Sequence, residues 1–424
     1  MKRIVTLVAA AALILGLAAT ASAELAVKAA GSWRVHGNVL SNFGDFDDDV
    51  SSTDSDTFTV QHRARTQLRF AYNENVMAEL YTEYGNATWG QGVGQYATLG
   101  GLNVKRAFVQ FRWPDTDVLI TAGEQDVTLP SSGAFSTMVL GGNDGSAIAV
   151  STPITDMLGL TVAYTRLYEN AAVSSGNDAD AFVAALPVAL DGMTLTPWFT
   201  YGIIGQNAEI DAEDPADVVD LNTDTETANV WWAGLGFNMD MLDPIVIYAD
   251  FVYGSADEGY ALGDDSSGWL IDAMVEFKGL DFAVLQGFGA YSSQNDDGDG
   301  AMPYIASDWG IGGSMVNGSA FTTDFGAATP GFWLVGVAAR DITFIEKLSH
   351  EVIALYAKGT SDTAGFGIVD LTSDDSYWEV DFNNRYQMYE SLAAIVELGY
   401  ADYDDDNADT DPLMKASFGF QYNF

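Results

Sequence analysis

The chain of 424 residues contains no cysteine, which excludes disulfide bridges and thiolate chemistry. Basic residues are scarce as well: seventeen Lys and Arg stand against sixty Asp and Glu, and the formal net charge is −43. A surface this acidic repels phosphate groups, so nucleic acid is a poor partner. Because 48% of the residues are hydrophobic and 12% aromatic, the composition nevertheless favours a folded protein over a disordered acidic chain.

Long apolar runs are also missing after the first twenty residues. Met1-Lys2-Arg3 is a short basic region, residues 4–19 are apolar, and Ala21-Ser22-Ala23 has the A-x-A form of a cleavage site. This arrangement predicts a secretory signal peptide over residues 1–23, with an uncleaved membrane anchor as the alternative. Residues 24–424 offer no apolar run of about eighteen residues, so we expect no membrane-spanning helix. They show no linker and no fixed repeat, which favours a single closed domain.

What the chain does have is strict alternation, seen most clearly in its last eleven residues. One face of this segment is apolar and the other polar, with Ala416, Phe418, Phe420, Tyr422 and Phe424 opposite Lys415, Ser417, Gly419, Gln421 and Asn423. A period of two indicates a β-strand, and about 9–11 residues suffice for one tilted crossing of a bilayer. A terminal strand of this kind resembles the closing strand of bacterial outer-membrane barrels, although an edge strand of a soluble sandwich also alternates.

Similar alternating segments recur along the whole chain. We expect eighteen strands, with sixteen as the alternative count: 27–40, 57–73, 76–88, 103–113, 117–126, 146–153, 159–169, 179–190, 193–205, 228–239, 244–255, 268–278, 281–293, 330–341, 348–359, 376–386, 392–402 and 414–424. Short turns between them alternate with long segments, as in bacterial barrels that keep both chain ends in the periplasm. The pattern predicts an all-β fold, a transmembrane antiparallel β-barrel with short periplasmic turns and long extracellular loops.

The expected long loops differ chemically from the rest of the chain. They contain thirty-four Asp or Glu and no Lys or Arg, over 41–56, 89–102, 127–145, 170–178, 206–227, 256–267, 294–329, 360–375 and 403–413. Solvation of an exposed rim is a sufficient explanation. The functional alternative is that divalent cations bridge these loops to lipopolysaccharide, and that the rim attracts cations to the mouth of a pore.

Three segments near the N-terminus place basic side chains on one strand face. In segment 57–73 this face carries Arg63, Arg65 and Arg69, and it must point into the lumen because an Arg facing lipid costs about 2–4 kcal/mol. Segments 27–40 and 103–113 add further basic residues, Arg34, Arg106 and Arg112, although Val104 and Phe108 intrude on the inner face of the latter segment. We expect a basic wall along a water-filled pore. The alternative is a structural set of salt bridges to the intervening segment, at Glu79 and Glu83.

Segment 127–145 is rich in Ser, Gly, Thr and Ala and follows the fifth expected strand. It resembles the constriction loop of trimeric general porins, which folds into the barrel, but its length alone also allows it to stay outside. Asp126 and Asp144 bracket it and would oppose the basic wall, and such a transverse field orients dipolar solutes. The expected pore-lining residues are Arg34, Arg63, Arg65, Arg69, Arg106, Arg112, Glu79, Glu83, Asp126 and Asp144.

The features that carry a family resemblance are the signal peptide, the run from Asn103 to Pro114, the following Thr121-Ala122-Gly123-Glu124-Gln125 and the aromatic C-terminus. In these features the sequence resembles the homotrimeric outer-membrane porins of sulfate-reducing and related bacteria. This resemblance implies that three barrels associate through their walls and that a loop, here 89–101, latches onto a neighbour. It also implies that the barrel-insertion machinery reads Phe424.

The expected function is passive diffusion of small hydrophilic solutes and ions through the outer membrane of a Gram-negative cell. A substrate-selective anion channel with a binding site at the basic wall is the main alternative, followed by a barrel enzyme or an adhesin. The sequence has neither an H-E-x-x-H zinc pattern nor a G-x-S-x-G nucleophile elbow. We therefore expect no catalytic residues, no metal and no cofactor.

Overall fold

The structure is a computed structural model that describes residues 25–42, 57–90, 102–169, 178–205, 208–210, 219–220, 227–257, 260, 265–293, 301–311, 313–321, 326–362, 365–366, 369, 371–405 and 410–424. The expected signal peptide, most of the expected latch loop 89–101 and much of the acidic loops lie outside these residues. Within the described ranges, no helix is both long enough and apolar enough to cross a membrane.

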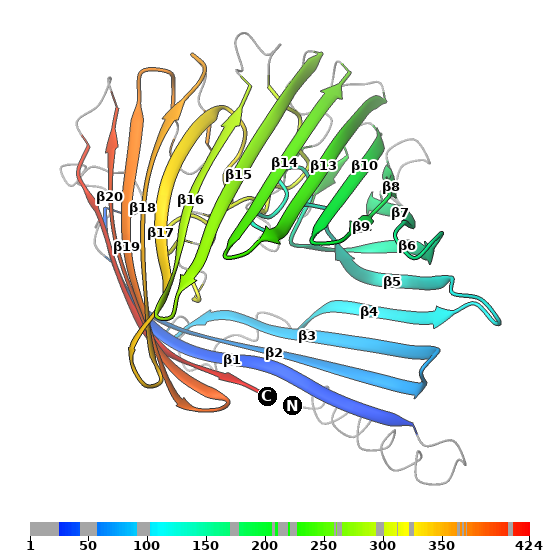
Figure 1. Cartoon of the computed structure of the whole chain (residues 1–424), viewed down its shortest axis with the longest axis horizontal. Coiled ribbons are helices and arrows are strands. Elements are labelled where there is room, and N and C mark those ends of the chain that lie inside the picture. Colours follow the sequence, from blue (N-terminus) through cyan, green and yellow to red (C-terminus); the bar gives the residue numbers. More distant parts are fainter. Residues whose placement is uncertain are drawn as a thin grey trace.

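The described strands are β1 (Ala26–Ser41), β2 (Thr57–Asn73), β3 (Val76–Thr88), β4 (Leu102–Arg112), β5 (Leu119–Val127), β6 (Asn143–Pro153), β7 (Gly159–Tyr168), β8 (Ala179–Ala185), β9 (Val188–Leu190), β10 (Met193–Ile204), β11 (Glu209–Ile210), β12 (Val219–Asp220), β13 (Ala228–Leu242), β14 (Ile245–Ala256), β15 (Ser266–Leu280), β16 (Ala283–Ser292), β17 (Phe332–Ile345), β18 (Leu348–Gly359), β19 (Ser376–Tyr389), β20 (Leu392–Asp404) and β21 (Leu413–Asn423). Apart from the small β11–β12 pair, they form one antiparallel sheet (Figure 1).

The sheet closes on itself because β1 pairs with both β2 and β21. Both β8 and β9 pair with β10, so they are two parts of one strand, interrupted at Leu186 and Pro187. The wall is therefore an eighteen-stranded closed antiparallel barrel. The expected fold and the count of eighteen strands are confirmed, and the alternative of sixteen is wrong.

Alternation of the side chains explains why these strands form a barrel with an apolar outside. In β1, Trp33 and Val35 are exposed on the outer face, whereas Arg34, His36 and Asn38 are buried on the inner face. Outer aromatic side chains also contact one another from strand to strand towards the end of the barrel that carries the long loops, at Phe199, Trp231, Tyr253, Trp269, Tyr291, Trp333, Tyr356, Trp378 and Tyr400. Such aromatic girdles are typical of transmembrane barrels.

The C-terminal residue takes part in closing the barrel. Gly31 and Phe424 exchange backbone N–H···O hydrogen bonds of 2.9 and 3.1 Å, and the Phe424 ring lies edge-on to Trp33 with 5.9 Å between ring centroids. Gly31 allows this close approach, because a Cβ at this position would lie 2.4 Å from the backbone oxygen of Arg65 and 2.7 Å from the Phe424 ring. The aromatic terminus is thus built into the seam where the first and last strands meet.

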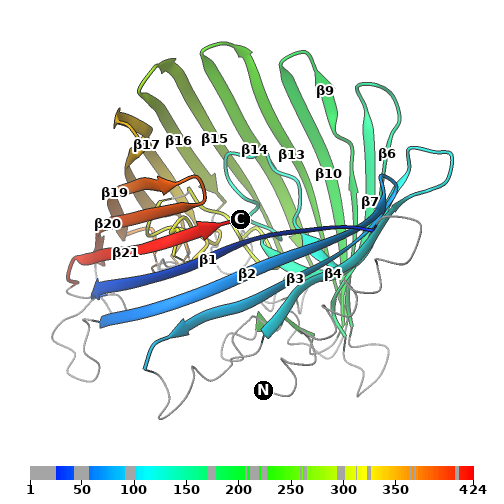
Figure 2. The ribbon, with the colours of Figure 1, turned by 90° about the horizontal axis from the view of Figure 1, so that it is seen from below.

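Two segments fold into the barrel, and the apolar core lies between them and the wall. The first inner loop is 128–142, between β5 and β6, and the second inner loop is 301–321, between β16 and β17 (Figure 2). They join through backbone hydrogen bonds, from Gly141 N to Ala306 O at 3.1 Å and from Ile305 N to Val139 O at 2.8 Å. Their buried side chains pack against wall residues such as Trp232. Of the two arrangements left open for segment 127–145, the inward one is observed.

Candidate solute pathway

A wall carboxylate holds the first inner loop in place. Asp250, on β14, accepts a hydrogen bond of 2.6 Å from the Ser132 backbone N–H and a second one from the Ser132 hydroxyl. Behind the loop, Gly236 on β13 leaves the space that the backbone of Ser131 occupies, because a Cβ there would lie 2.9 Å from it. The loop therefore reaches strands far around the wall from β5 and β6, its own strands.

The second inner loop is held in the same way at two further carboxylates. Asp381 accepts from the backbone N–H and the hydroxyl of Ser314, at 2.8 and 2.5 Å. Glu397 accepts from the hydroxyl of Ser319 and the backbone N–H of Ala320, both at 2.6 Å. A carboxylate that accepts a backbone N–H and a serine hydroxyl together is thus the recurring means by which the wall fixes the inner loops.

Basic residues complete the anchoring of the second inner loop. Lys415 has a fully buried side chain whose Nζ lies 3.1 Å from Glu397 Oε2, and it also donates to the carbonyl of Ser314. Arg34 donates to the Ala320 carbonyl at 2.6 Å. Next to it, His36 stacks on Phe321 with 4.6 Å between ring centroids. The second inner loop covers Arg34, which is only 4% exposed, so this residue anchors the loop rather than facing open solvent.

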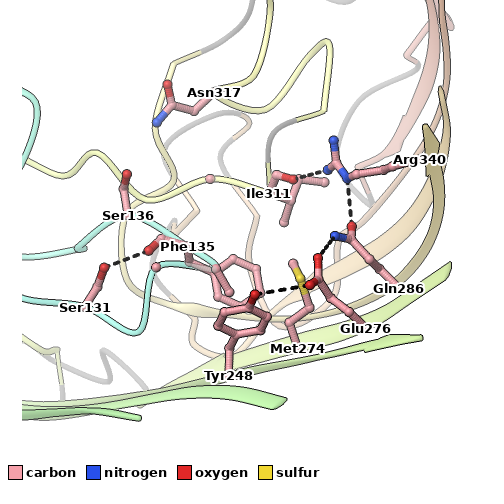
Figure 3. A pocket seen from close by; sticks show the side chains of 13 residues that line it. Ser131, Phe135, Ser136, Tyr248, Met274, Glu276, Gln286, Ile311, Asn317 and Arg340 are labelled. Atoms are coloured by element: carbon pink, nitrogen blue, oxygen red, sulfur yellow. Dashed lines mark hydrogen bonds between the residues drawn. The ribbon is translucent and has the colours of Figure 1, made fainter. Parts of the chain in front are cut away.

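A polar cavity of about 460 Å³ lies between the inner loops and the wall (Figure 3). The wall side consists of β14–β17 residues near the short turns, namely Tyr248, Met274, Glu276, Gln286 and Arg340. The opposite side consists of inner-loop residues, including Ser131, Phe135, Ser136, Ile311 and Asn317. The cavity is therefore part of the barrel interior on the side of the short turns, bounded by both loops.

Hydrogen bonds order the wall of this cavity. The Tyr248 hydroxyl donates to Glu276 at 3.1 Å, Gln286 donates to Glu276 at 2.6 Å, and Arg340 donates to Gln286 at 2.7 Å. The charges are compensated, because Lys278 lies 2.9 Å from Glu276, and Arg340 lies 2.6 Å from the carboxylate of the neighbouring Glu351. This arrangement presents dipoles without a net charge, a surface suited to polar solutes in water.

The expected basic wall is present on β2, and its guanidinium groups are paired. The β2–β3 register places Arg65 opposite Glu83 and Arg69 opposite Glu79. Arg65 contacts Glu83 directly, Arg63 lies 3.9 Å from the same carboxylate, and Arg69 lies 2.8 Å from Glu79. The salt bridges to Glu79 and Glu83 are therefore present, and the Arg69 side chain remains 53% exposed.

Arg106 lies elsewhere, where the β4–β5 ladder ends at Ala107 and Glu124. Its guanidinium group is 2.8 Å from Asp126 and 2.7 Å from Asp144, and Lys105 is 3.0 Å from Asp144. Asp126 and Asp144 therefore pair directly with Arg106, one of the residues of the expected basic wall, and Asp144 also pairs with Lys105, so they do not oppose that wall from across the lumen. Figure 1 shows β4 and β5 diverging here.

The contribution of Lys105 was missed because of a β-bulge. The β3–β4 register shifts between Tyr81 and Thr82, which pair with Arg106 and Val104, so Lys105 is the extra residue. Strict alternation fails at a bulge. The bulge also explains why Val104, which intrudes on the expected inner face, lies on the outer side, where it is 52% exposed.

Arg112 is separate from the other basic residues. It ends β4, its side chain is 41% exposed, and it lies 3.7 Å from Asp117 in the following turn. The structure thus brings Arg63, Arg65 and Glu83 together, and it places Arg112 at the short-turn end of the barrel.

The anchoring carboxylates were not anticipated from the sequence, although a signal for them exists. Asp250, Asp381 and Glu397 are acidic residues at buried, inward positions of their strands. An acidic residue at such a position requires a donor to compensate its burial. The sequence does not reveal that the donors come from distant loops.

Comparison with known proteins identifies solved structures that have a similar fold. No protein-family model matches the sequence, and a search of curated proteins finds no match. Among solved structures, Pseudomonas aeruginosa OccK2 (OpdF) matches with a TM-score of 0.58 at 12% identity, over 94% of this chain and 97% of that chain. Pseudomonas aeruginosa OpdL matches with a TM-score of 0.57 at 12% identity, over 94% and 98%. The chain is thus similar in fold to these outer-membrane porins. This similarity supports a bacterial porin fold, and it identifies neither the homotrimeric porin family that the sequence resembles nor a trimer.

Proposed function

We propose that this chain forms a water-filled channel through which small hydrophilic solutes and ions diffuse passively across a bacterial outer membrane. The observation that carries the proposal is a closed barrel, apolar outside, whose interior is narrowed by two anchored loops beside a polar cavity of about 460 Å³. The fold likeness to porins supports the same conclusion. A channel needs no catalytic group, so a non-enzymatic role is part of the proposal.

Within this channel, the residues predicted from the sequence have different roles. Arg63, Arg65 and Arg69 line the conducting path, because they project from the inner face of β2 and the Arg65 and Arg69 side chains keep exposed surface. Glu79 and Glu83 moderate their positive charge. Arg106, with Asp126 and Asp144, sets the field where β4 and β5 diverge. Arg34 holds the second inner loop, and Arg112 lies near the short-turn exit.

The remaining expectations belong to the same proposal. Residues 1–23 direct export and are removed, and residues 24–424 form the barrel domain. Three copies associate into a homotrimer, with loop 89–101 as the latch. The acidic extracellular loops contact lipopolysaccharide, partly through divalent cations.

A substrate-selective anion channel is the second candidate. The partly exposed Arg65 and Arg69 favour it, because an exposed guanidinium group can bind a small anion. A selective channel would show conductance that saturates with one anion, whereas a diffusion channel would show conductance that rises steadily with salt.

Liposome swelling tests the proposed function. Vesicles containing the refolded protein should swell in isotonic solutions of small uncharged sugars, at rates that fall steeply as solute size increases. Protein-free vesicles, and vesicles with heat-denatured protein, should not swell. Equal rates for all sizes would indicate leakage, and no swelling with any solute would contradict the channel.

A further inference from the structure

Two carboxylates face each other on the inner wall where the inner loops meet it. The β14–β15 register pairs Asp250 with Asp272, and both are buried, with exposures of 7% and 2%. Each residue holds a different loop. Asp250 accepts two hydrogen bonds from Ser132 of the first inner loop, and Asp272 Oδ2 accepts from the indole N–H of Trp309 in the second, at 2.8 Å.

The remaining oxygen of Asp272 lacks a donor. Among the described residues, Oδ1 is fully buried and has no hydrogen-bond partner. The β14–β15 register places this carboxylate directly opposite that of Asp250, which is also buried. Two ionised carboxylates only accept hydrogen bonds, so this arrangement is favourable only when one of them carries a proton.

No neighbouring group supplies a compensating charge. Across the ladder, the residues next to the pair are Gly236 on β13 and Ala290 on β16. From the described parts of the inner loops, Ser132 and Trp309 donate hydrogen bonds to the pair, and neither is charged. Along β14, the nearest titratable group is Tyr248, which donates to Glu276 rather than to Asp250. In the described part of the chain, no Lys, Arg or His forms an ion pair with either aspartate.

We propose that Asp250 and Asp272 share one proton at neutral pH, and that this proton-binding site fastens both inner loops to one point of the barrel wall. The shared proton gives Asp272 Oδ1 its missing partner and reduces the buried charge from two to one. A divalent cation fits less well. Calcium takes six to eight oxygen ligands, whereas only two carboxylates and the Ser132 hydroxyl are present and the Trp309 N–H already occupies one oxygen.

The proton makes the position of the loops sensitive to pH in one direction. At neutral and acidic pH the pair is protonated and the loops stay attached to the wall. When alkaline pH removes the proton, two negative charges face each other in a buried site and the attachment weakens. The effect on conduction rests on the proposed channel function, whereas the presence of the proton does not.

Infrared spectroscopy of the refolded full-length protein tests for the proton directly. The wild type at neutral pH should show the carbonyl stretch of a protonated carboxylic acid, and ¹³C-aspartate labelling should shift part of this band. The band should decrease in Asp272→Asn. It should stay unchanged in Glu351→Gln, the matched control, because Glu351 is ion-paired with Arg340.

A wild-type band that ¹³C-aspartate leaves in place would overturn the proposal without requiring any variant to fold. So would a folded Asp272→Asn protein with an unchanged band, or calcium that the wild type binds stoichiometrically and Asp272→Asn does not. Single-channel recordings then test the consequence: wild-type current noise should rise at alkaline pH, and Asp272→Asn should lack this rise. Absence of any channel would count against the proposed function, while leaving the infrared result as the test of the proton.

Discussion

The buried pair of Lys415 and Glu397 offers a quantitative test of how the second inner loop is held. Replacing Lys415 with Met removes the charge while keeping a long side chain in a fully buried position. Glu397 then loses the ammonium group 3.1 Å away and keeps the hydrogen bonds from Ser319 and Ala320. Removing one partner of a buried ion pair typically costs about 3–5 kcal/mol, because the other charge stays buried without compensation.

The double variant Lys415→Met with Glu397→Gln separates this effect from lost packing. A neutral glutamine no longer leaves a buried charge, so the double variant should be destabilised less than the single one. The matched control is Lys278→Met, since the pair of Lys278 with Glu276 is at the surface of the cavity and the Lys278 side chain is 47% exposed. An exposed ion pair contributes about 1 kcal/mol or less to the free energy of unfolding.

The assay is urea unfolding of the refolded barrel in detergent, followed by tryptophan fluorescence, together with current noise in single channels. Lys415→Met should lower the free energy of unfolding by about 3 kcal/mol or more and make the open current noisier. If Lys415→Met is no less stable than Lys278→Met, or if the double variant is less stable than the single one, the account of loop anchoring is wrong.

Three further predictions concern assembly and ion preference. Deleting Phe424 should reduce the amount of barrel in the outer membrane, because the residue belongs to the seam with Gly31, and it should leave the conductance of surviving pores unchanged. A normal amount of the barrel protein in membrane fractions would contradict this. Gly31→Ala should lower the refolding yield, measured by the gel shift of heated and unheated samples, because its Cβ would lie 2.4 Å from the backbone oxygen of Arg65; a wild-type yield would argue against it. The wild type should be weakly cation-selective at low salt, and this selectivity should decrease as the salt concentration rises. The double variant Arg63→Gln and Arg65→Gln should shift the reversal potential further towards cations, because Glu83 then loses both nearby guanidinium groups. If the reversal potential is unchanged at every salt concentration, these residues do not line the path.

The sequence was sufficient to predict the wall of the barrel for a physical reason. Lipid outside the barrel and water or polar groups inside it require apolar and polar side chains to alternate with a period of two along every strand. Each expected strand is found within a few residues of its predicted bounds. The inner face of β2 was predicted in the same way, since Arg63, Arg65 and Arg69 have no acceptable position in lipid.

The arrangement of the interior was not predictable to the same degree. The inward position of segment 128–142 depends on Ser132 meeting Asp250, and the burial of Arg34 depends on the carbonyl of Ala320, which is distant in sequence. Such long-range contacts leave no periodic signal. Lys105 was missed for a local reason, because a single bulge changes which side chains share a face.

The central claim, that solutes pass beside the inner loops through the barrel, is tested most directly with single cysteines, because the chain contains none. Ser136 lines the polar cavity from the first inner loop, and Asn75 lies in the exposed turn after β2. Our account predicts that a charged methanethiosulfonate reagent lowers the single-channel conductance of Ser136→Cys in planar bilayers and leaves that of Asn75→Cys unchanged. An unchanged conductance of Ser136→Cys, with complete labelling confirmed by mass spectrometry, would contradict the claim that the conducting path runs between the inner loops and the wall.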